Sequence, residues 1–223
     1  MNAALIPTGK VVADIGCDHA KLSIYLIENK IAAKVIAMDI GEGPLARAKA
    51  NINGFGMEEC IECRLSDGAQ KIGRREDNNP EADVIVMAGI GGRLALKIVD
   101  ESIDIFRDLD CFIIQAQSEL DVLRKDLYGK GFFIEEEDMV YEEGKYYTAD
   151  RWKYMTEMSF HTQPSDAELL YGPRLIEKRH PVLFEYLQKE NKKYKRLMQD
   201  IPEDKNTIIK DRYRLTEELL DWR

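Results

Sequence analysis

The chain has 223 residues, of which 44% are hydrophobic and 33% are charged, a balance that is ordinary for a globular protein. Its 32 Lys and Arg stand against 41 Asp and Glu, and the resulting net charge of −9 excludes nucleic-acid binding through bulk positive charge. No apolar stretch approaches the ~18 residues of a membrane span, and the N-terminus lacks the pattern of a secretory signal, so we expect a cytoplasmic protein.

Short β-rich runs alternate with helical patterns over residues 1–160. Strands are expected at 10–15, 34–40, 59–65, 83–87 and 111–115. Helices are expected between them, at about 20–29 and 43–53, from the glycine cluster at 88–92 through about 105, and at 119–128. Two last β runs flank a hairpin turn at 142–145. This order predicts an α/β fold with a Rossmann-like, mostly parallel sheet that ends in an antiparallel hairpin.

The pattern becomes helical after about residue 160. Ser165-Asp166-Ala167-Glu168 is a capping box, and Gly172-Pro173 and His180-Pro181 predict two more helix starts. Heptad spacing then relates Phe184, Leu187, Asn191, Tyr194, Met198 and Ile201, and after a turn at 202–204 it relates Ile208, Leu215, Leu219 and Trp222. We predict two domains, an α/β domain at 1–160 and a coiled-coil-like helical hairpin at 161–223. The seam can pair within one chain or between two, so a monomer and a weak dimer both remain open.

The segment Asp14-Ile15-Gly16-Cys17-Asp18-His19-Ala20 links the first strand to the first helix. This turn lies at the carboxyl edge of the sheet, where α/β proteins bind ligands. It lacks the glycines of a dinucleotide fingerprint and the lysine of a P-loop. An acidic side chain such as Asp18 is unsuited to a diphosphate but suits a positively charged cofactor, such as S-adenosylmethionine with its sulfonium and amino groups.

Two later strand ends carry matching groups. Asp39, followed by Ile40, stands where a carboxylate accepts hydrogen bonds from ribose hydroxyls. After the third strand, Asp67 can accept from an adenine amine while Gly68 leaves space for the ring. The three strand ends together predict a class I methyltransferase. Its cofactor-binding residues would be Asp14, Gly16, Asp18, Asp39, Ile40, Asp67 and Gly68.

The fourth strand ends in Ala88-Gly89-Ile90-Gly91-Gly92, where a methyltransferase brings its acceptor to the methyl group. The segment lacks the Asn/Asp-Pro-Pro-aromatic motif common in enzymes that methylate exocyclic amines, and its glycines permit close backbone approach. DIGCDHA, AGIGG, QAQSE at 115–119 and EEGKYY at 142–147 together resemble the bacterial tRNA adenine-N1 methyltransferases, which modify adenine 22 in the D-arm.

This resemblance covers nearly the whole chain and implies methyl transfer from S-adenosylmethionine to N1 of adenine 22 in tRNA. It assigns catalysis to Asp18, His19, Gly91, Gln115 and Gln117, and it adds Ala88 and Gly89 to the cofactor-binding residues. The two glutamines would hydrogen-bond the edge of the base. Relatives often carry Tyr and Pro where this chain has Lys21 and Ser23.

The charge is unevenly distributed along the chain. Residues 1–160 carry −10 and residues 161–223 carry +1, while residues 174–196 alone carry +5. A solvated helix surface is the ordinary interpretation of such a run. Together with the resemblance, it instead predicts a tRNA-contacting surface formed by Arg174, Lys178, Arg179, Lys189, Lys192, Lys193 and Arg196. Tyr141, Tyr146 and Tyr147 are expected in the core, with base stacking as the alternative.

Two other functions remain open on the sequence. One is a methyltransferase for a small molecule or a protein, and the other is a non-catalytic protein that dimerises through the helical hairpin. Cys60 and Cys63 have the spacing of a metal or redox pair, but no second pair or nearby histidine completes a site. A strand would place the two thiols on opposite faces, so we expect reduced cysteines and no metal.

Overall fold

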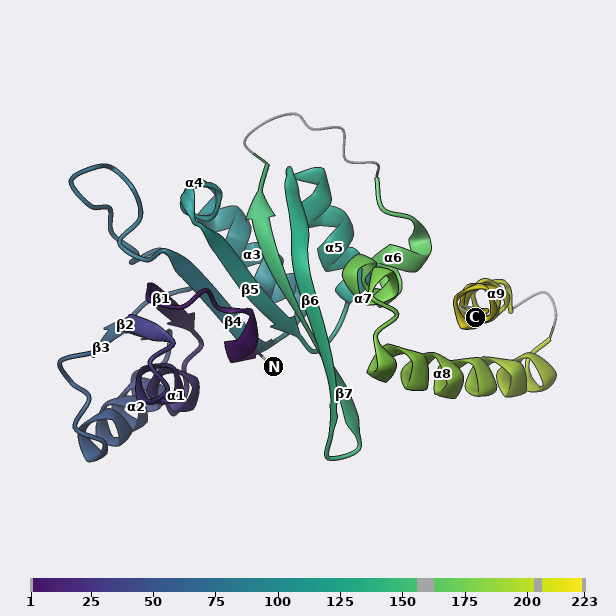
Figure 1. Ribbon diagram of the computed structural model, residues 1–223, viewed down its shortest axis with the longest axis horizontal. Coiled ribbons are helices and arrows are strands. Elements are labelled where there is room, and N and C mark those ends of the chain that lie inside the picture. Colours follow the sequence, from purple (N-terminus) through teal and green to yellow (C-terminus); the bar gives the residue numbers. More distant parts are fainter. Residues whose placement is uncertain (1, 156–162, 203–205, 222–223) are drawn as a thin grey trace. The chain divides into compact units, whose positions relative to one another are not determined.

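A computed structural model describes residues 2–155, 163–202 and 206–221. Within them, a seven-stranded sheet has the order β3-β2-β1-β4-β5-β7-β6 (Figure 1). Its strands are β1 (Lys10–Ile15), β2 (Ala32–Asp39), β3 (Ile61–Leu65), β4 (Val84–Ile90), β5 (Cys111–Ala116), β6 (Phe132–Glu142) and β7 (Lys145–Tyr154). The pairs among β1 to β5 are parallel, and β7 is antiparallel to β5. The predicted fold class is confirmed.

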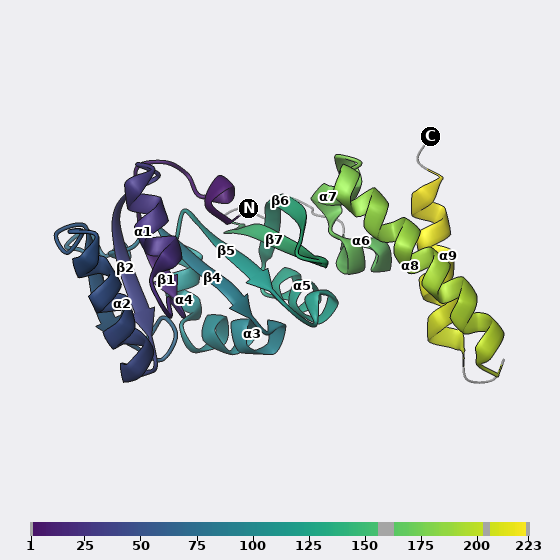
Figure 2. The ribbon, with the colours of Figure 1, turned by 90° about the horizontal axis from the view of Figure 1, so that it is seen from below.

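Helices cover both faces of the sheet (Figure 2). On one face lie α1 (Lys21–Glu28), α2 (Glu42–Gly54) and the 3₁₀ helix Asn2–Leu5. On the other lie α3 (Gly92–Glu101), α4 (Ile103–Asp108) and α5 (Leu120–Gly129). Such two-sided coverage is what a parallel sheet requires, because both of its faces must be buried.

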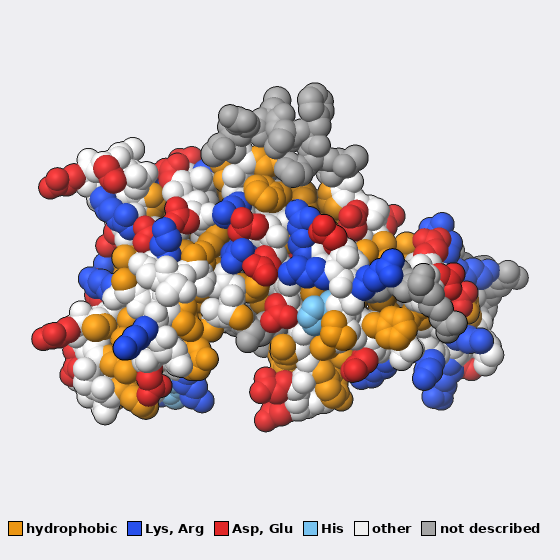
Figure 3. All heavy atoms as spheres, viewed as in Figure 1, with side chains coloured by type: hydrophobic (Ala, Val, Ile, Leu, Met, Phe, Trp, Pro, Cys, Tyr) orange, Lys and Arg blue, Asp and Glu red, His pale blue; other side chains and the backbone are white. Residues whose placement is uncertain are grey.

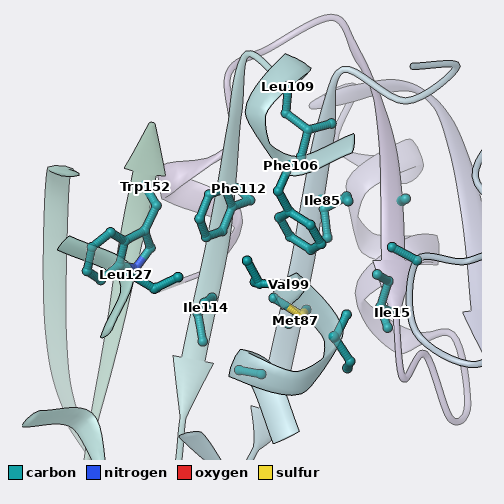
Figure 4. Packing of buried hydrophobic residues seen from close by; sticks show 14 of the residues in the cluster. Ile15, Ile85, Met87, Val99, Phe106, Leu109, Phe112, Ile114, Leu127 and Trp152 are labelled. Atoms are coloured by element: carbon teal, nitrogen blue, oxygen red, sulfur yellow. The ribbon is translucent and has the colours of Figure 1, made fainter. Parts of the chain in front are cut away.

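Alternation along the central strands supplies both halves of the core. On β4, Ile85 and Met87 pack in the cluster under α3 to α5, whereas Val84 and Val86 pack in the cluster under α1 and α2. Phe112 on β5 lies at the centre of the first cluster (Figure 4). Its ring meets Phe106 and Phe132 edge-on, at centroid distances of 5.1 and 5.2 Å, and stacks on Trp152 at 6.4 Å.

Two local predictions were wrong. The helix expected through about residue 105 is interrupted at Ser102, whose backbone is not helical (φ −136°, ψ 32°) and whose carbonyl accepts the first hydrogen bonds of α4. This break lets Phe106 enter the core. Cys60 lies in a turn before β3 rather than in the strand, so Cys60 and Cys63 pack against the same hydrophobic cluster, and both are free thiols.

A buried charge network lies between α5 and the terminal hairpin. Arg124 is 1% exposed, and its Nε lies 3.2 Å from Oδ2 of Asp150 while its Nη2 lies 3.0 Å from Oε1 of Glu137. Both carboxylates are also buried. Because a buried guanidinium without partners is very costly, the two acids and the arginine depend on one another.

The chain divides into two compact units. The first comprises Met1–Asp138 and Thr148–Gln163, and the second comprises Met139–Tyr147 and Pro164–Arg223. The helices of the second unit are α6 (Asp166–Tyr171), α7 (Pro173–Glu177), α8 (Pro181–Asp200) and α9 (Thr207–Leu220). The tip of the β6–β7 hairpin therefore groups with these helices.

In the second unit, α8 and α9 pack against one another as a helical pair. The predicted capping box at Ser165 and Glu168 is present, and α7 and α8 both begin at the predicted prolines. Leu183 and Leu187 are buried in the hydrophobic cluster of the second unit, but the predicted seam residues Phe184 and Ile208 are exposed. The heptad assignment was one residue out of register at the start of α8. Trp222 lies outside the described residues.

Candidate active site

Backbone hydrogen bonds hold three strand ends together at the carboxyl edge of the sheet. The N–H of Gly16, just after β1, donates to the carbonyl of Met38 at 2.8 Å. The N–H of Ser66, just after β3, donates to the carbonyl of Asp39 at 2.9 Å. The turns after β1 and β3 therefore flank the end of β2, as the strand order predicts.

The turn after β1 has a left-handed backbone at three positions. Gly16, Asp18 and Ala20 have φ values of 77°, 44° and 55°. Gly16 is exposed, and a Cβ built on it would meet no atom within 4 Å. Space is therefore open in front of this turn, and the glycine is required by its backbone conformation.

Asp39 receives two backbone donors. The N–H of Asp18 donates to Oδ2 at 3.3 Å, and the N–H of Gly41 donates to Oδ1 at 2.8 Å. Its neighbour Ile40 is 68% exposed, an uncommon position for a large apolar side chain. The carboxylate and the isoleucine thus lie together at the sheet edge, which suits contact with a ribose and an adenine ring.

Asp14 lies beneath the turn, where it is buried. It accepts a hydrogen bond of 2.6 Å from the hydroxyl of Ser23 on α1. Burial raises the pKa of Asp14 from 3.8 to about 6, and the charge of Asp39 acts in the same direction. Sequence reasoning noted Ser23 only as a departure from the pattern of the resembled family, and it missed this hydrogen bond.

Asp18 and His19, the polar residues at the end of the turn after β1, have 60% and 41% of their side-chain surface exposed. Arg47 on α2 lies 3.3 Å from Oδ1 of Asp18, and Nε2 of His19 lies 3.6 Å from Oδ2 of the same carboxylate. The amide of Asn51 donates to the carbonyl of His19 at 2.9 Å. Arg47 and Asn51 were missed at the sequence level, because nothing in a helix sequence shows which loop it faces.

The turn after β3 is shaped by Ser66 and Gly68. The Ser66 hydroxyl donates to the carbonyl of Gly68 at 2.9 Å and accepts from the N–H of Lys71 at 3.2 Å. Gly68 has φ 55°, and a Cβ there would lie 3.0 Å from two carbons of Ile98. Asp67, between them, is partly exposed and remains accessible to a ligand.

The ends of β4 and β5 approach each other closely. Ala88 pairs with Gln115, and the register then shifts so that Gly89 becomes an extra residue. The N–H of Gly89 donates to Oε1 of Gln115 at 2.9 Å, and the N–H of Gln117 donates to the carbonyl of Ile90 at 2.8 Å. Gly91 is the N-cap of α3 and lies two residues after Gly89.

The accessible carboxylates at this edge of the sheet fit a cationic nucleoside cofactor, because they accept hydrogen bonds and carry negative charge. Three acidic side chains, Asp18, Asp39 and Asp67, are accessible beside an open glycine turn. No cluster of three His, Cys, Asp or Glu able to hold a metal occurs among the described residues. In the same part of the chain, no helix combines the length and apolarity needed to cross a membrane.

The residues predicted to contact tRNA lie on α7, α8 and the turn between them. Lys178, Arg179, Lys192 and Arg196 are exposed. Three others interact locally. Arg174 lies 2.7 Å from Glu177, Lys193 lies 3.0 Å from Glu190, and Lys189 lies 5.2 Å from the ring centroid of Tyr146. Figure 3 shows basic side chains on α8 and α9 interspersed with acidic ones.

The tyrosines at the hairpin differ in burial. Tyr141 is 52% exposed, and Tyr146 and Tyr147 are partly buried. The Tyr146 ring packs between those of Tyr141 and Tyr186, at centroid distances of 4.6 and 5.0 Å. Tyr146 thus packs against the core of the second unit.

Comparison with known proteins gives one consistent answer. The family described as tRNA (adenine(22)-N(1))-methyltransferase matches residues 12–220. The Bacillus subtilis tRNA (adenine(22)-N(1))-methyltransferase is 30% identical over 98% of this chain and 94% of its own length. The crystal structure of the B. subtilis m1A22 tRNA methyltransferase superposes with a TM-score of 0.79, at 29% identity over 98% of this chain and 95% of that one. A Streptococcus pneumoniae protein in complex with S-adenosyl-L-methionine superposes with a TM-score of 0.84, at 28% identity over 98% and 95% of the two chains.

Proposed function

The chain belongs to the tRNA (adenine(22)-N(1))-methyltransferase family, and from this premise we propose how its residues carry out the reaction. The enzyme transfers a methyl group from S-adenosylmethionine to N1 of adenine 22 in tRNA. The observation that carries the residue assignment is the hydrogen-bonded junction of three strand ends at Gly16, Asp39 and Ser66.

We propose that the accessible carboxylates at this junction hold the cofactor. Asp39 accepts from its ribose hydroxyls, and Ile40 packs against its adenine ring. Asp67 accepts from the adenine amine, with Gly68 beside the ring. The backbone of Gly16, Ala88 and Gly89 borders the methionine portion, whose positive groups are stabilised by Asp14 and Asp18. When bound, S-adenosylmethionine supplies a methyl group activated by its sulfonium.

The chemistry asks for positioning and charge rather than a strong base. N1 of neutral adenine carries an in-plane lone pair, so no proton has to be removed before it attacks. The base becomes positively charged as the N1–C bond forms, and a nearby carboxylate stabilises that charge. Asp18, with His19 beside it, is the group proposed for this role. Gly91 lets the backbone approach the base, and Gln115 and Gln117 hydrogen-bond its edge.

The target adenine must leave its stack or pair to present N1, as in other enzymes that act on bases. We propose that the seven basic residues of α7 and α8 and their connecting turn hold the tRNA backbone while this happens. In this assignment residues 1–160 bind the cofactor and residues 161–223 contact tRNA. The packing of α8 on α9 within one chain favours a monomer over a weak dimer, and the cytoplasm, where tRNA is modified, is the proposed location.

The test is direct. The purified protein is incubated with unmodified tRNA and S-adenosylmethionine, and the methylated nucleoside is identified and mapped by mass spectrometry. We expect N1-methyladenosine at position 22, and no product when that adenine is replaced by guanine. Methylation elsewhere, or of a small molecule or protein only, would favour the alternative class I methyltransferase.

A further inference from the structure

The bulge at the end of β4 is held by a side chain. Gly89 is the extra residue between the pairs Ala88–Gln115 and Ile90–Ala116, and its φ is 75°. A bulge takes such a residue out of the regular ladder of backbone hydrogen bonds. Here Oε1 of Gln115 accepts the N–H of Gly89 at 2.9 Å. The Gln115 side chain therefore bonds the N–H of a residue that has no paired residue on β5.

This contact fixes which way the amide of Gln115 faces. With Oε1 on the N–H of Gly89, the other end of the amide is Nε2, which carries two N–H donors. Gln115 is only 7% exposed, and Nε2 has no hydrogen-bond partner among the described residues. A buried donor without an acceptor is costly, so its retention beside a catalytic turn points to a ligand that supplies the acceptor.

The position of Gln115 narrows the choice of ligand. In the proposed function, the acceptor base approaches the end of β4. The amide of Gln117 also lies at this bulge, since a Cβ built on Gly89 would lie 3.7 Å from its Nε2. Neutral adenine offers three ring acceptors, N1, N3 and N7. N1 has to remain free to attack the methyl group, and N3 lies beside the ribose. N7 remains, next to the N6 amine.

Resting on the proposed function, we propose that Gln115 reads the N6–N7 edge of the target adenine, with Nε2 donating to N7. A glutamine amide matches this edge, because its oxygen accepts from N6 while its nitrogen donates to N7. Oε1 has a second lone pair beyond the one used by Gly89. Accepting from N6 also favours the cationic product, whose charge is shared between N1 and N6. Guanine places a carbonyl oxygen at position 6, so the same amide disfavours it.

The experiment compares tRNA carrying adenosine or 7-deazaadenosine at position 22. The wild-type enzyme is expected to lose about tenfold in kcat/KM on the 7-deaza substrate, the cost of one base-edge contact. Gln115→Glu keeps the acceptor for Gly89 but removes the donor. It is expected to lose about tenfold on adenosine and to show no further loss on 7-deazaadenosine. Gln115→Met, which has no donor and only a weakly accepting sulfur, is expected to be equally insensitive to N7.

Controls separate the loss of the N7 contact from effects of added charge, lost stability or weaker cofactor binding. Gln70→Glu introduces the same charge at an exposed glutamine and is expected to keep the wild-type sensitivity to N7. Thermal melting and S-adenosylmethionine affinity are measured for every variant. An equal penalty for 7-deazaadenosine in the wild type and both Gln115 variants would overturn the proposal, as would weakened cofactor binding as the only defect. If the wild type does not methylate the adenosine substrate, the proposed function itself fails.

Discussion

The backbone N–H of Asp18 donates to Oδ2 of Asp39 across 3.3 Å and joins two turns that lie 21 residues apart in the chain. Asp18 reaches this position with a left-handed backbone, φ 44°, a conformation that Asp and Asn adopt more readily than most residues. Asp39 is therefore both a proposed cofactor ligand and the acceptor that shapes the glycine turn in front of it.

Replacing Asp39 with Ala is expected to weaken S-adenosylmethionine binding by about 10- to 100-fold. The substitution removes an ionised acceptor for the ribose and releases the N–H of Asp18, and hydrogen bonds to charged groups contribute about 1.5–3 kcal/mol. Titration calorimetry with S-adenosylhomocysteine measures the effect. Asp104→Asn, an exposed acid on α4, is the control. Unchanged affinity in Asp39→Ala would refute the assignment of this carboxylate.

Asp18→Asn removes the negative charge of this side chain without adding backbone strain, since Asn tolerates the same left-handed conformation. It replaces the charged partner of Arg47 with a neutral amide but leaves the N–H that donates to Asp39. We expect methyl transfer to fall by about tenfold while the protein keeps its melting temperature, because the carboxylate stabilises charge rather than the fold. Single-turnover kinetics with saturating cofactor measure the step. A rate equal to that of the wild type would leave Asp18 without a catalytic role.

The raised pKa of Asp14 makes the stability of the folded protein depend on pH. Because the pKa is raised from 3.8 to about 6, the folded protein holds this proton more tightly than the unfolded chain does. The contribution of Asp14 to stability therefore falls as the pH rises from about 4 to 6. Asp14→Asn removes this dependence. Denaturant unfolding should show that, between pH 4 and pH 7, the free energy of unfolding of the variant rises relative to that of the wild type by on the order of 2 kcal/mol.

Cofactor affinity should change with pH in the opposite direction. The ionised form of Asp14 attracts the positive groups of S-adenosylmethionine, so wild-type affinity rises as the pH passes through about 6. The Asp14→Asn variant should lack this rise. Parallel pH profiles for the two proteins would show that another group controls binding.

The surface prediction concerns α8. Reversing Lys192, Lys193 and Arg196 to Glu is expected to weaken tRNA binding by at least tenfold and to leave cofactor affinity unchanged. Each lost phosphate contact makes the dependence of log K on log salt less steep by roughly 0.7–0.9, so three contacts change the slope by about 2–3. Filter binding at several salt concentrations measures both quantities.

The matched control reverses Lys30, Lys71 and Lys125, three exposed lysines of the first unit, and changes the net charge by the same amount. If both triple variants bind tRNA equally weakly, the effect comes from net charge and α8 is not a specific contact. Equal binding by the α8 variant and the wild type would make this run a solvated helix face.

Local patterns predicted the sheet but not the contacts across it. Lys10–Ile15 forms a strand with the predicted bounds, because a short, mostly apolar run between turns specifies a buried strand locally. The acids at Asp14, Asp39 and Asp67 were found because parallel strands end at one edge. The burial of Arg124 with Glu137 and Asp150 could not be read from the sequence, since it depends on which elements pack together. The same holds for Ser23 on Asp14 and for Gln115 on Gly89.

Gly92 explains part of the AGIGG segment through packing. A Cβ on this residue would lie 2.7 Å from the carbonyl oxygen of Ser118 and 3.0 Å from that of Glu119, and both are backbone atoms of the turn after β5. Gly92→Ala must therefore push that turn away. We expect a loss of about 1–3 kcal/mol in the free energy of unfolding, the usual cost of overpacking.

The same displacement should impair catalysis beyond the loss of stability, because the turn carries Gln117 and follows Gln115. Gly54→Ala, at the end of α2, is the control, since a Cβ there meets no atom within 4 Å. It should be neutral or stabilising by up to about 1 kcal/mol, as expected for alanine in place of a helical glycine. Denaturant unfolding and kcat/KM at a temperature where both variants are folded distinguish the two. If Gly92→Ala and Gly54→Ala have the same free energy of unfolding and the same kcat/KM, then Gly92 is not needed for the close approach of the turns after β4 and β5.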